Sequence, residues 1–146
     1  MKIFLTDQAQ NLKDHLDALK VLPVMNYKKE ILTKKISTIE INTTKAFLQI
    51  NLDFLFEYKI FPQNILSFKS QWQDENREMK IGDTIAQQVC IPPIRLFSQK
   101  IIFGVRVSEI INDSTQKGFS YETLEGHVER GVFNIYGRTT RQQINI

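Results

Sequence analysis

Hydrophobic residues near the start of the chain recur at the spacing of an amphipathic helix. Leu12, Leu16 and Leu19 stand at positions i, i+4 and i+7, so they share one helix face. Asp7 is placed to cap this helix, and Pro23 ends it. The first predicted element is therefore a helix between Asp7 and Pro23.

A second amphipathic helix is predicted between Thr43-Thr44, which offer a cap, and Pro62, which closes it. Its apolar side chains form two neighbouring ridges. One ridge consists of Phe47, Phe54 and Tyr58, and the other consists of Leu48, Leu52 and Leu55. Between the two predicted helices, residues 36–41 alternate apolar with polar side chains and predict a short strand.

Beyond residue 62 the hydrophobic period changes from about 3.6 to about 2, which is typical of strands. Three runs keep this period, with the apolar positions Leu66, Phe68 and Trp72; Ile81, Ile85, Val89 and Ile91; and Ile101, Phe103, Val105, Val107 and Ile111. Residues 112–114 then predict a polar turn, two more strands flank Leu124–Gly126, and residues 138–146 form a polar tail.

The order of these elements predicts an α+β fold. Consecutive antiparallel strands that are each half apolar must bury one face, and the two helices are available to cover it. We therefore expect a curved antiparallel sheet packed on helices. The chain has 146 residues, 42% of them hydrophobic and 24% charged, without a linker or repeat, so a single domain over residues 1–146 is predicted.

Charge and the N-terminal segment narrow the classes of partner. The chain has 19 Lys and Arg against 16 Asp and Glu, with short basic pairs at Lys28-Lys29 and Lys34-Lys35. No run reaches five or six like charges, so we expect no binding to nucleic acid or to a membrane. The apolar run at Ile3–Leu5 is too short for a signal peptide or a membrane span, which predicts a cytoplasmic protein.

The chain has few residues that bind metals or act as nucleophiles. Cys90 is the only cysteine, so an internal disulfide is excluded, and its apolar surroundings predict a buried, inert thiol. With only His15 and His127 as further soft ligands, neither a metal site nor a bound cofactor is expected.

The segment Gly118–Gly131 holds the densest set of chemically capable side chains in the chain. A three-residue loop ending at Gly126 suits a hairpin turn, because glycine adopts a positive φ without steric cost. This loop predicts that Thr123 faces His127, that Tyr121 faces Glu129 and that Phe119 faces Gly131. A two-residue loop would instead pair Glu122 with Glu129, and like charges weaken a sheet.

The predicted register places six side chains on one largely aromatic face: Phe119, Tyr121, Thr123, His127, Glu129 and Phe133. Such a wall with a few polar groups predicts the binding of a small, mainly apolar or amphipathic ligand. One alternative is a cyclase-like or hydrolase-like enzyme that uses His127 with Tyr121 or Glu129 as acid and base. In a second alternative, these polar groups form hydrogen bonds only with one another and have a purely structural role.

Three residues outside this segment are candidates for the same roles. Trp72 on a strand is expected in the core. His15 lies beside the apolar stripe of the first helix and is expected on the surface. Arg106 is expected to face solvent or to pair with an acid such as Glu109, whereas an inward orientation would make it an anion contact.

The same segment resembles a known motif, Gly-Phe-x-Tyr-Gly-Thr-Leu-Pro-Gly-His-Pro-Glu-x-Gly. The matching residues are Gly118, Phe119, Tyr121, Thr123, Leu124, Gly126, His127, Glu129 and Gly131. The motif is the hallmark of a branch of unassigned function within the START-related, polyketide-cyclase-like (SRPBCC) superfamily. The resemblance extends over residues 16–136 and implies a helix-grip fold, in which a curved antiparallel sheet and a long C-terminal helix enclose a hydrophobic cavity.

The chain departs from this motif in ways that affect the expected cavity. Glu122, Glu125 and Val128 replace the Gly and the two Pro of the motif, so the turn is less constrained. Few residues follow the last predicted strand, so the C-terminal helix is expected to be short or missing. An open groove, a homodimer or a sheet face that docks another protein would follow.

Overall fold

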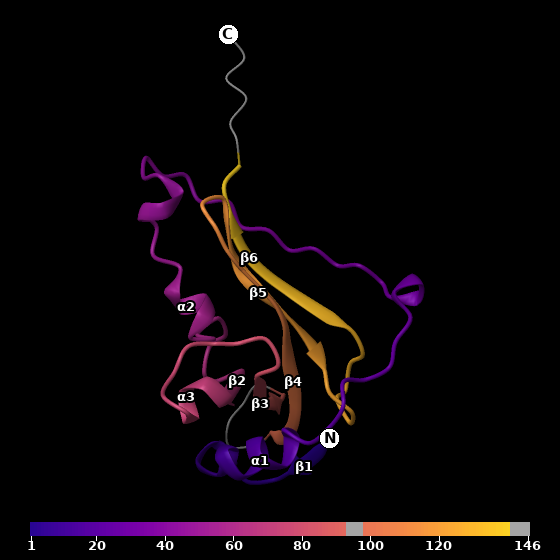
Figure 1. Ribbon diagram of the computed structural model, residues 1–146. Helices are drawn as coiled ribbons and strands as arrows, with labels where there is room; N and C mark the ends of the chain where they lie inside the picture. Colours follow the sequence, from indigo (N-terminus) through magenta and orange to yellow (C-terminus); the bar gives the residue numbers. More distant parts are fainter. Residues whose placement is uncertain (93–97, 141–146) are drawn as a thin grey trace.

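In the computed structural model, which describes residues 1–92 and 98–140, a six-stranded antiparallel sheet is packed with short helices (Figure 1). The strands are β1 (Lys2–Phe4), β2 (Leu66–Ser70), β3 (Thr84–Ile91), β4 (Gln99–Asn112), β5 (Gln116–Thr123) and β6 (Val132–Arg138). The sheet order is β2-β3-β4-β5-β6, and β1 pairs with the first part of β4. The predicted α+β class with an antiparallel sheet is confirmed.

The helices are α1 (Leu12–Leu19), α2 (Asp53–Phe56) and α3 (Gln71–Asp74), and short 3-10 turns occur at Ala9–Asn11, Lys29–Ile31 and Phe47–Gln49. Within the described residues, none of these helices has the length and apolar character that a membrane span requires. The predicted polar tail begins inside β6, and its residues 141–146 lie outside the described residues.

The first predicted helix is confirmed as α1, and it covers one face of the sheet. The Asp7 carboxylate accepts a hydrogen bond from the Ala9 N–H at 2.8 Å, but it is not the predicted cap of the helix, because the N-cap residues are Gln8 for the preceding 3-10 turn and Asn11 for α1. Leu12 and Leu16 of α1 pack against Ala86 and Ile102 of β3 and β4. Leu16 is fully buried, and complete burial of such a side chain contributes about 1.5–3 kcal/mol.

The opposite face of β3, β4 and β5 carries the larger core cluster, with Tyr58 near its centre. Tyr58 is 1% exposed, and its ring lies 4.9 Å from that of Phe68 and 6.0 Å from that of Phe119, measured between centroids. Trp72 joins the same cluster, as predicted, but it lies on the helix α3 and not on the predicted strand, because β2 ends at Ser70. The central strands therefore bury both faces, one under α1 and the other under α2, α3 and the loop between α2 and β2.

The second predicted helix is much shorter in the structure, where only Asp53–Phe56 is α-helical. The Asn51 side chain accepts a hydrogen bond from the Asp53 N–H at 2.8 Å, which fixes the start of α2 there. Tyr58 has a φ of 58°, and this left-handed conformation ends the helix after one turn. Burying Tyr58 in the core thus takes precedence over continuing the amphipathic pattern.

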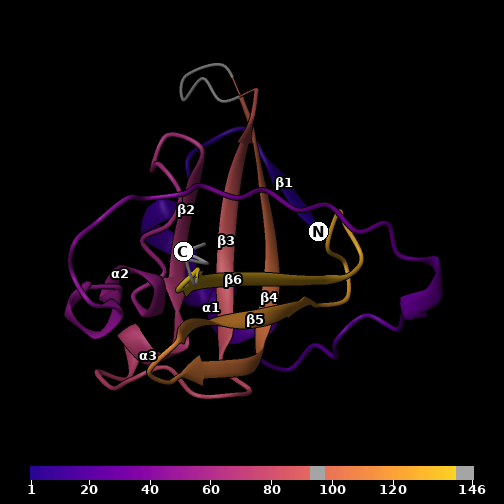
Figure 2. The ribbon, with the colours of Figure 1, turned by 90° about the horizontal axis from the view of Figure 1, so that it is seen from above.

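The strand predicted at residues 36–41 is not part of the sheet. Residues 33–46, which we call the strap, are exposed throughout and contain no helix or strand. Both ribbon views show the strap passing outside the β5–β6 hairpin on its way to α2 (Figures 1 and 2). The strap has the alternating pattern of a strand in its sequence, but no strand of the described chain pairs with it.

Arg106 on β4 anchors the end of α1, in contrast to the expectation that it faces solvent or pairs with Glu109. Its guanidinium donates hydrogen bonds to the backbone carbonyls of Lys20 at 3.0 Å and Leu22 at 2.9 Å, and to the Thr84 hydroxyl at 3.2 Å. Burial lowers the pKa of the guanidinium. Cationic donors satisfy carbonyls at a helix C-terminus, so this contact stabilises the packing of α1 on the sheet.

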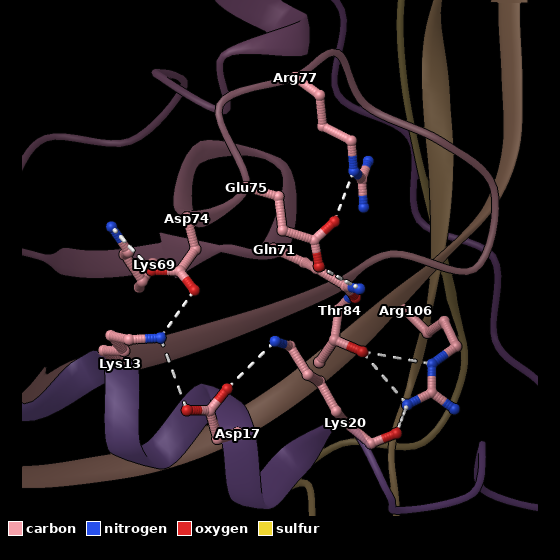
Figure 3. Close-up of polar contacts among 10 residues, drawn as sticks. All are labelled: Lys13, Asp17, Lys20, Lys69, Gln71, Asp74, Glu75, Arg77, Thr84 and Arg106. Atoms are coloured by element: carbon pink, nitrogen blue, oxygen red, sulfur yellow. Dashed lines mark hydrogen bonds and ion pairs between the residues drawn. The ribbon is translucent and has the colours of Figure 1, made fainter.

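Ion pairs join α1 to α3 at the surface of the same region (Figure 3). The Lys13 ammonium lies 2.8 Å from the Asp74 carboxylate and 3.6 Å from that of Asp17. Arg77 donates two hydrogen bonds, at 2.7 and 2.8 Å, to the carboxylate of Asp83, which is 4% exposed. Because the Lys13 side chain is 58% exposed, solvent screens its ion pairs and they contribute little to stability, whereas the Arg77–Asp83 pair is partly buried.

We predict that Gly118→Ala destabilises the fold by about 3 kcal/mol, the upper end of the usual cost of overpacking. A Cβ atom at Gly118 would lie 2.0 Å from the Ile135 carbonyl oxygen on β6, so the β5–β6 pairing would have to shift. Gly131→Ala is the matched control, because Gly131 has a similar φ, 156° against 158°, and its added Cβ would contact only Leu32 at 4.0 Å. Urea unfolding checks this prediction, and equal losses in the two variants would contradict it.

Candidate functional site

The turn between β5 and β6 is wider than the predicted three-residue hairpin. Tyr121 pairs with Phe133, and Phe119 pairs with Ile135. The Thr123 N–H donates a hydrogen bond to the Gly131 carbonyl at 3.1 Å, which closes the ladder. The predicted pairs Thr123–His127, Tyr121–Glu129 and Phe119–Gly131 are therefore wrong.

Tertiary contacts of Leu124 explain the wider turn. Leu124 is completely buried, its N–H donates to the Gly104 carbonyl at 3.0 Å, and it forms an antiparallel bridge with Val24. The absence of a Cβ on Gly104 makes room for Leu124, whose Cδ1 would lie 2.9 Å from such an atom. Gly126 has a φ of 82°, so its predicted left-handed conformation is confirmed even though the loop is longer.

Tyr121 continues the aromatic core toward the surface of the hairpin. Its ring stacks on that of Phe133, with centroids 5.2 Å apart and an interplanar angle of 19°. Tyr121 is 5% exposed, whereas Phe133 is 36% exposed. Burial raises the pKa of the Tyr121 hydroxyl, which is therefore protonated at neutral pH. The stack thus links a buried phenol to an aromatic ring that solvent reaches.

A buried polar pair lies beside Tyr121. The Gln87 side-chain amide donates to the Tyr58 hydroxyl at 2.5 Å, and the Tyr121 hydroxyl is in polar contact with both groups. Gln87 is 3% exposed. Burial raises the pKa of Tyr58 well above its usual value, so this hydroxyl is also neutral. Sequence reasoning missed Gln87, although it lies two residues from Ile85 and so faces the same side of β3.

His127 lies in the wide turn and packs on β4. Its ring centroid is 4.1 Å from that of Phe103, at an interplanar angle of 55°. Its Nδ1 accepts a hydrogen bond from the Glu129 N–H at 2.9 Å, so the neutral imidazole carries its proton on Nε2. Burial lowers the pKa of His127 to about 4. At neutral pH the ring is therefore a hydrogen-bond donor through Nε2 and carries no charge.

Thr123 and Glu129 have different surroundings. Thr123 is completely buried, and its hydroxyl oxygen accepts a hydrogen bond from the Gly131 N–H at 3.1 Å. Glu129 is exposed, and within residues 1–92 and 98–140 no hydrogen bond or ion pair of its carboxylate is found. Its negative charge still contributes to the raised pKa of Tyr121.

The six predicted residues therefore fall into two groups. Phe119, Tyr121, Thr123 and Phe133 share one face of β5 and β6, as predicted, because paired and alternate residues of a ladder point the same way. His127 and Glu129 belong to the turn and are not opposite Thr123 and Tyr121. In the described ranges, no group of three or more His, Cys, Asp or Glu residues is arranged to hold a metal ion.

Of two other predicted residues, Cys90 matches its expectation and His15 does so only in part. Cys90 is buried, as expected. His15 is only half exposed, because its ring lies 5.3 Å from that of Phe4 and its Nε2 lies 3.3 Å from the Gln8 Oε1. Tyr27 lies between α1 and the strap. Its hydroxyl donates to the Glu122 carboxylate at 2.5 Å and tethers the chain ahead of the strap to β5.

A model of the family described as domain of unknown function DUF1990 matches residues 38–135, and the chain belongs to this family. The matched range includes most of the strap, all of β2 to β5 and the wide turn. Comparison with curated proteins and with solved structures gave no match.

We predict that Tyr58→Phe lowers the free energy of unfolding by about 1–3 kcal/mol, because the buried Gln87 amide loses its acceptor. Adding Gln87→Leu to Tyr58→Phe should recover part of the loss, since both polar partners are then removed. Tyr27→Phe, at a half-exposed hydrogen bond, is the control and should cost less. Chemical denaturation of the four proteins measures this, and a double variant no more stable than Tyr58→Phe would contradict the pairing.

We also predict that His127 makes the protein less stable as the pH falls. The folded protein holds His127 neutral down to about pH 4, whereas the unfolded chain protonates it below about pH 6.5. The unfolded state therefore binds more protons in this window, and stability falls from about pH 6.5 to about pH 4. His127→Gln should show a weaker pH dependence in urea unfolding. His15→Gln is the comparison, because burial lowers the pKa of His15 less than that of His127 and the loss of His15 should weaken the pH dependence less. Identical curves for wild type and His127→Gln would contradict the prediction.

Proposed function

We propose that this protein holds a small, mainly apolar or amphipathic ligand against the face of β5 and β6 that carries the Tyr121–Phe133 stack. The observation that supports this most directly is the exposure of Phe133, 36%, at the end of an otherwise buried row of aromatic rings. An apolar ligand stacked on Phe133 would extend that row and remove the ring from water. Aromatic contacts of this kind contribute about 0.5–1.5 kcal/mol beyond simple burial.

The turn supplies the polar contacts of the proposed site. The Nε2–H of neutral His127 is a donor, because Nδ1 is already occupied by the Glu129 N–H. The exposed Glu129 carboxylate is an acceptor for a hydroxyl or amine of an amphipathic ligand. In this proposal Phe119 and Thr123 support the site from within, since both are completely buried.

The proposed ligand site fits a START-related, helix-grip-like domain over residues 1–146 in the cytoplasm. The strongly curved hairpin and the apolar face inside its curve support this assignment (Figure 1). Leu52, next to α2, packs against β6, where a Cβ at Gly137 would lie 2.7 Å from the Leu52 Cδ1. Segments ahead of β2 would then cover the face that a long C-terminal helix covers in the helix-grip fold.

The protonation states favour binding over acid–base catalysis. A base that works near neutral pH has a pKa close to 7, whereas burial lowers that of His127 to about 4. Burial raises the pKa of Tyr121, which makes its hydroxyl a weaker acid than an exposed phenol. The alternative in which His127 works with Tyr121 or Glu129 as an enzyme therefore receives less support than a binding protein.

We predict that freshly purified protein carries a small molecule in native mass spectrometry or, once emptied, binds the apolar probe 8-anilino-1-naphthalenesulfonate. Phe133→Ala should weaken probe binding about tenfold through the lost stacking and burial. His127→Gln should weaken it about fivefold if the probe accepts the Nε2–H bond. Fluorescence titration gives both values.

Phe54→Ala is the matched control, because Phe54 of α2 is similarly exposed, at 44%, and does not belong to the Tyr58 cluster. It should leave probe affinity unchanged. Absence of both a copurified molecule and probe binding would contradict the proposal. So would an equal loss of affinity in Phe133→Ala and Phe54→Ala.

A further inference from the structure

The strap has the features of a strand that lacks a partner. Ile36, Ile39 and Ile41 are 75%, 87% and 82% exposed, although isoleucine is among the residues most often buried. Among the described residues, the backbone groups of residues 33–42 form no hydrogen bond. β-branched residues in an alternating pattern favour pairing in a sheet, so this segment is suited to join one.

One end of the sheet offers a matching partner. β2 is the terminal strand at this end. The Cys90 N–H donates to the Ile65 carbonyl at 3.4 Å, and this bond determines which residues of β2 have backbone groups that face β3. In an antiparallel ladder, residues alternate between bonding inward and outward. The N–H and carbonyl of Phe68 therefore point away from β3, toward the open edge. The outward N–H groups of Leu66 and Ser70 bind the Pro62 carbonyl and the Gln73 side chain, so an added strand would pair at Phe68.

A hollow of about 430 Å³ lies beside this edge. Phe61, Phe68, Leu66 and Leu12 give it apolar walls, and Lys59 and Ser67 are among its polar ones. A second hollow of about 490 Å³ shares Ala9 with it and continues along the turn before α1. An extended segment at the β2 edge would thus find space and apolar surface for its side chains.

We propose that the strap of a second copy of this chain adds to the β2 edge as an antiparallel strand, with its isoleucines in the adjoining hollow. The chain itself holds both halves of this pairing, an unpaired strand-like segment and an open edge. By two-fold symmetry, each copy gives its strap to the other, so that the contact forms twice. The dimer leaves Phe133 and the proposed ligand face unused.

The size of the contact is sufficient for a stable dimer. Each copy contributes the strap, residues 33–46, and the lining of the two hollows, together about 25 residues. Stable interfaces have roughly 20–30 residues a side.

Sedimentation velocity and native mass spectrometry of the full chain test the dimer. Ile39→Asp should raise the dimer dissociation constant at least tenfold, because a charge would be buried in the hollow. Val21→Asp, at an equally exposed site outside the strap, is the matched control and should leave it unchanged. Gln63→Trp, which fills the hollow from an exposed position, should weaken the dimer as Ile39→Asp does. Circular dichroism verifies that all three variants fold.

Mixing the two weakened variants gives the most specific result. Ile39→Asp keeps an intact edge and Gln63→Trp keeps an intact strap, so their mixture should form a heterodimer through one restored contact. A protein that stays monomeric up to about 1 mM would overturn the proposal. A dimer that survives both variants, or a mixture without heterodimer, would overturn it as well. None of these outcomes depends on whether the Phe133 face binds a ligand.

Discussion

The structure depends on the burial of both faces of β3 and β4. Ala86 and Ile102 face α1, whereas Ile85 and Val105, at alternate positions, face the Tyr58 cluster. Neither strand has a solvated side in its central part, so every element that covers them is fixed by the same packing. α1, the short α2 and the β5–β6 hairpin take their positions from this two-sided core.

A core of this kind must also accommodate polar groups, and the structure does so with specific partners. Arg106 binds the carbonyls at the end of α1, and Gln87 binds Tyr58. On the α1 face, the Gln88 amide oxygen accepts from the Gln8 N–H at 2.6 Å. An unpaired group at any of these positions would cost about 1–3 kcal/mol, so the polar contacts specify how α1 and α2 dock.

The turn motif combines structural and exposed groups within a few residues. Thr123 and Leu124 are completely buried and hold the wide turn, whereas Phe133 and Glu129 reach solvent. His127 lies between the two, since one ring nitrogen binds the backbone and burial keeps the ring neutral. A ligand site here would therefore rest on a scaffold that the same short segment provides.

Local patterns in the sequence determined α1, the central strands, the left-handed Gly126 and the burial of Trp72. Each of these follows from the spacing of apolar residues along the chain or from backbone sterics. The register of the hairpin was decided only by tertiary structure, since Leu124 fills the space above Gly104 and draws the turn open. The length of α2 and the role of Arg106 were decided in the same way, by the burial of Tyr58 and by the carbonyls at the end of α1. Periodicity shows which residues are apolar along one element, but the space that each side chain can fill depends on segments far away in the chain.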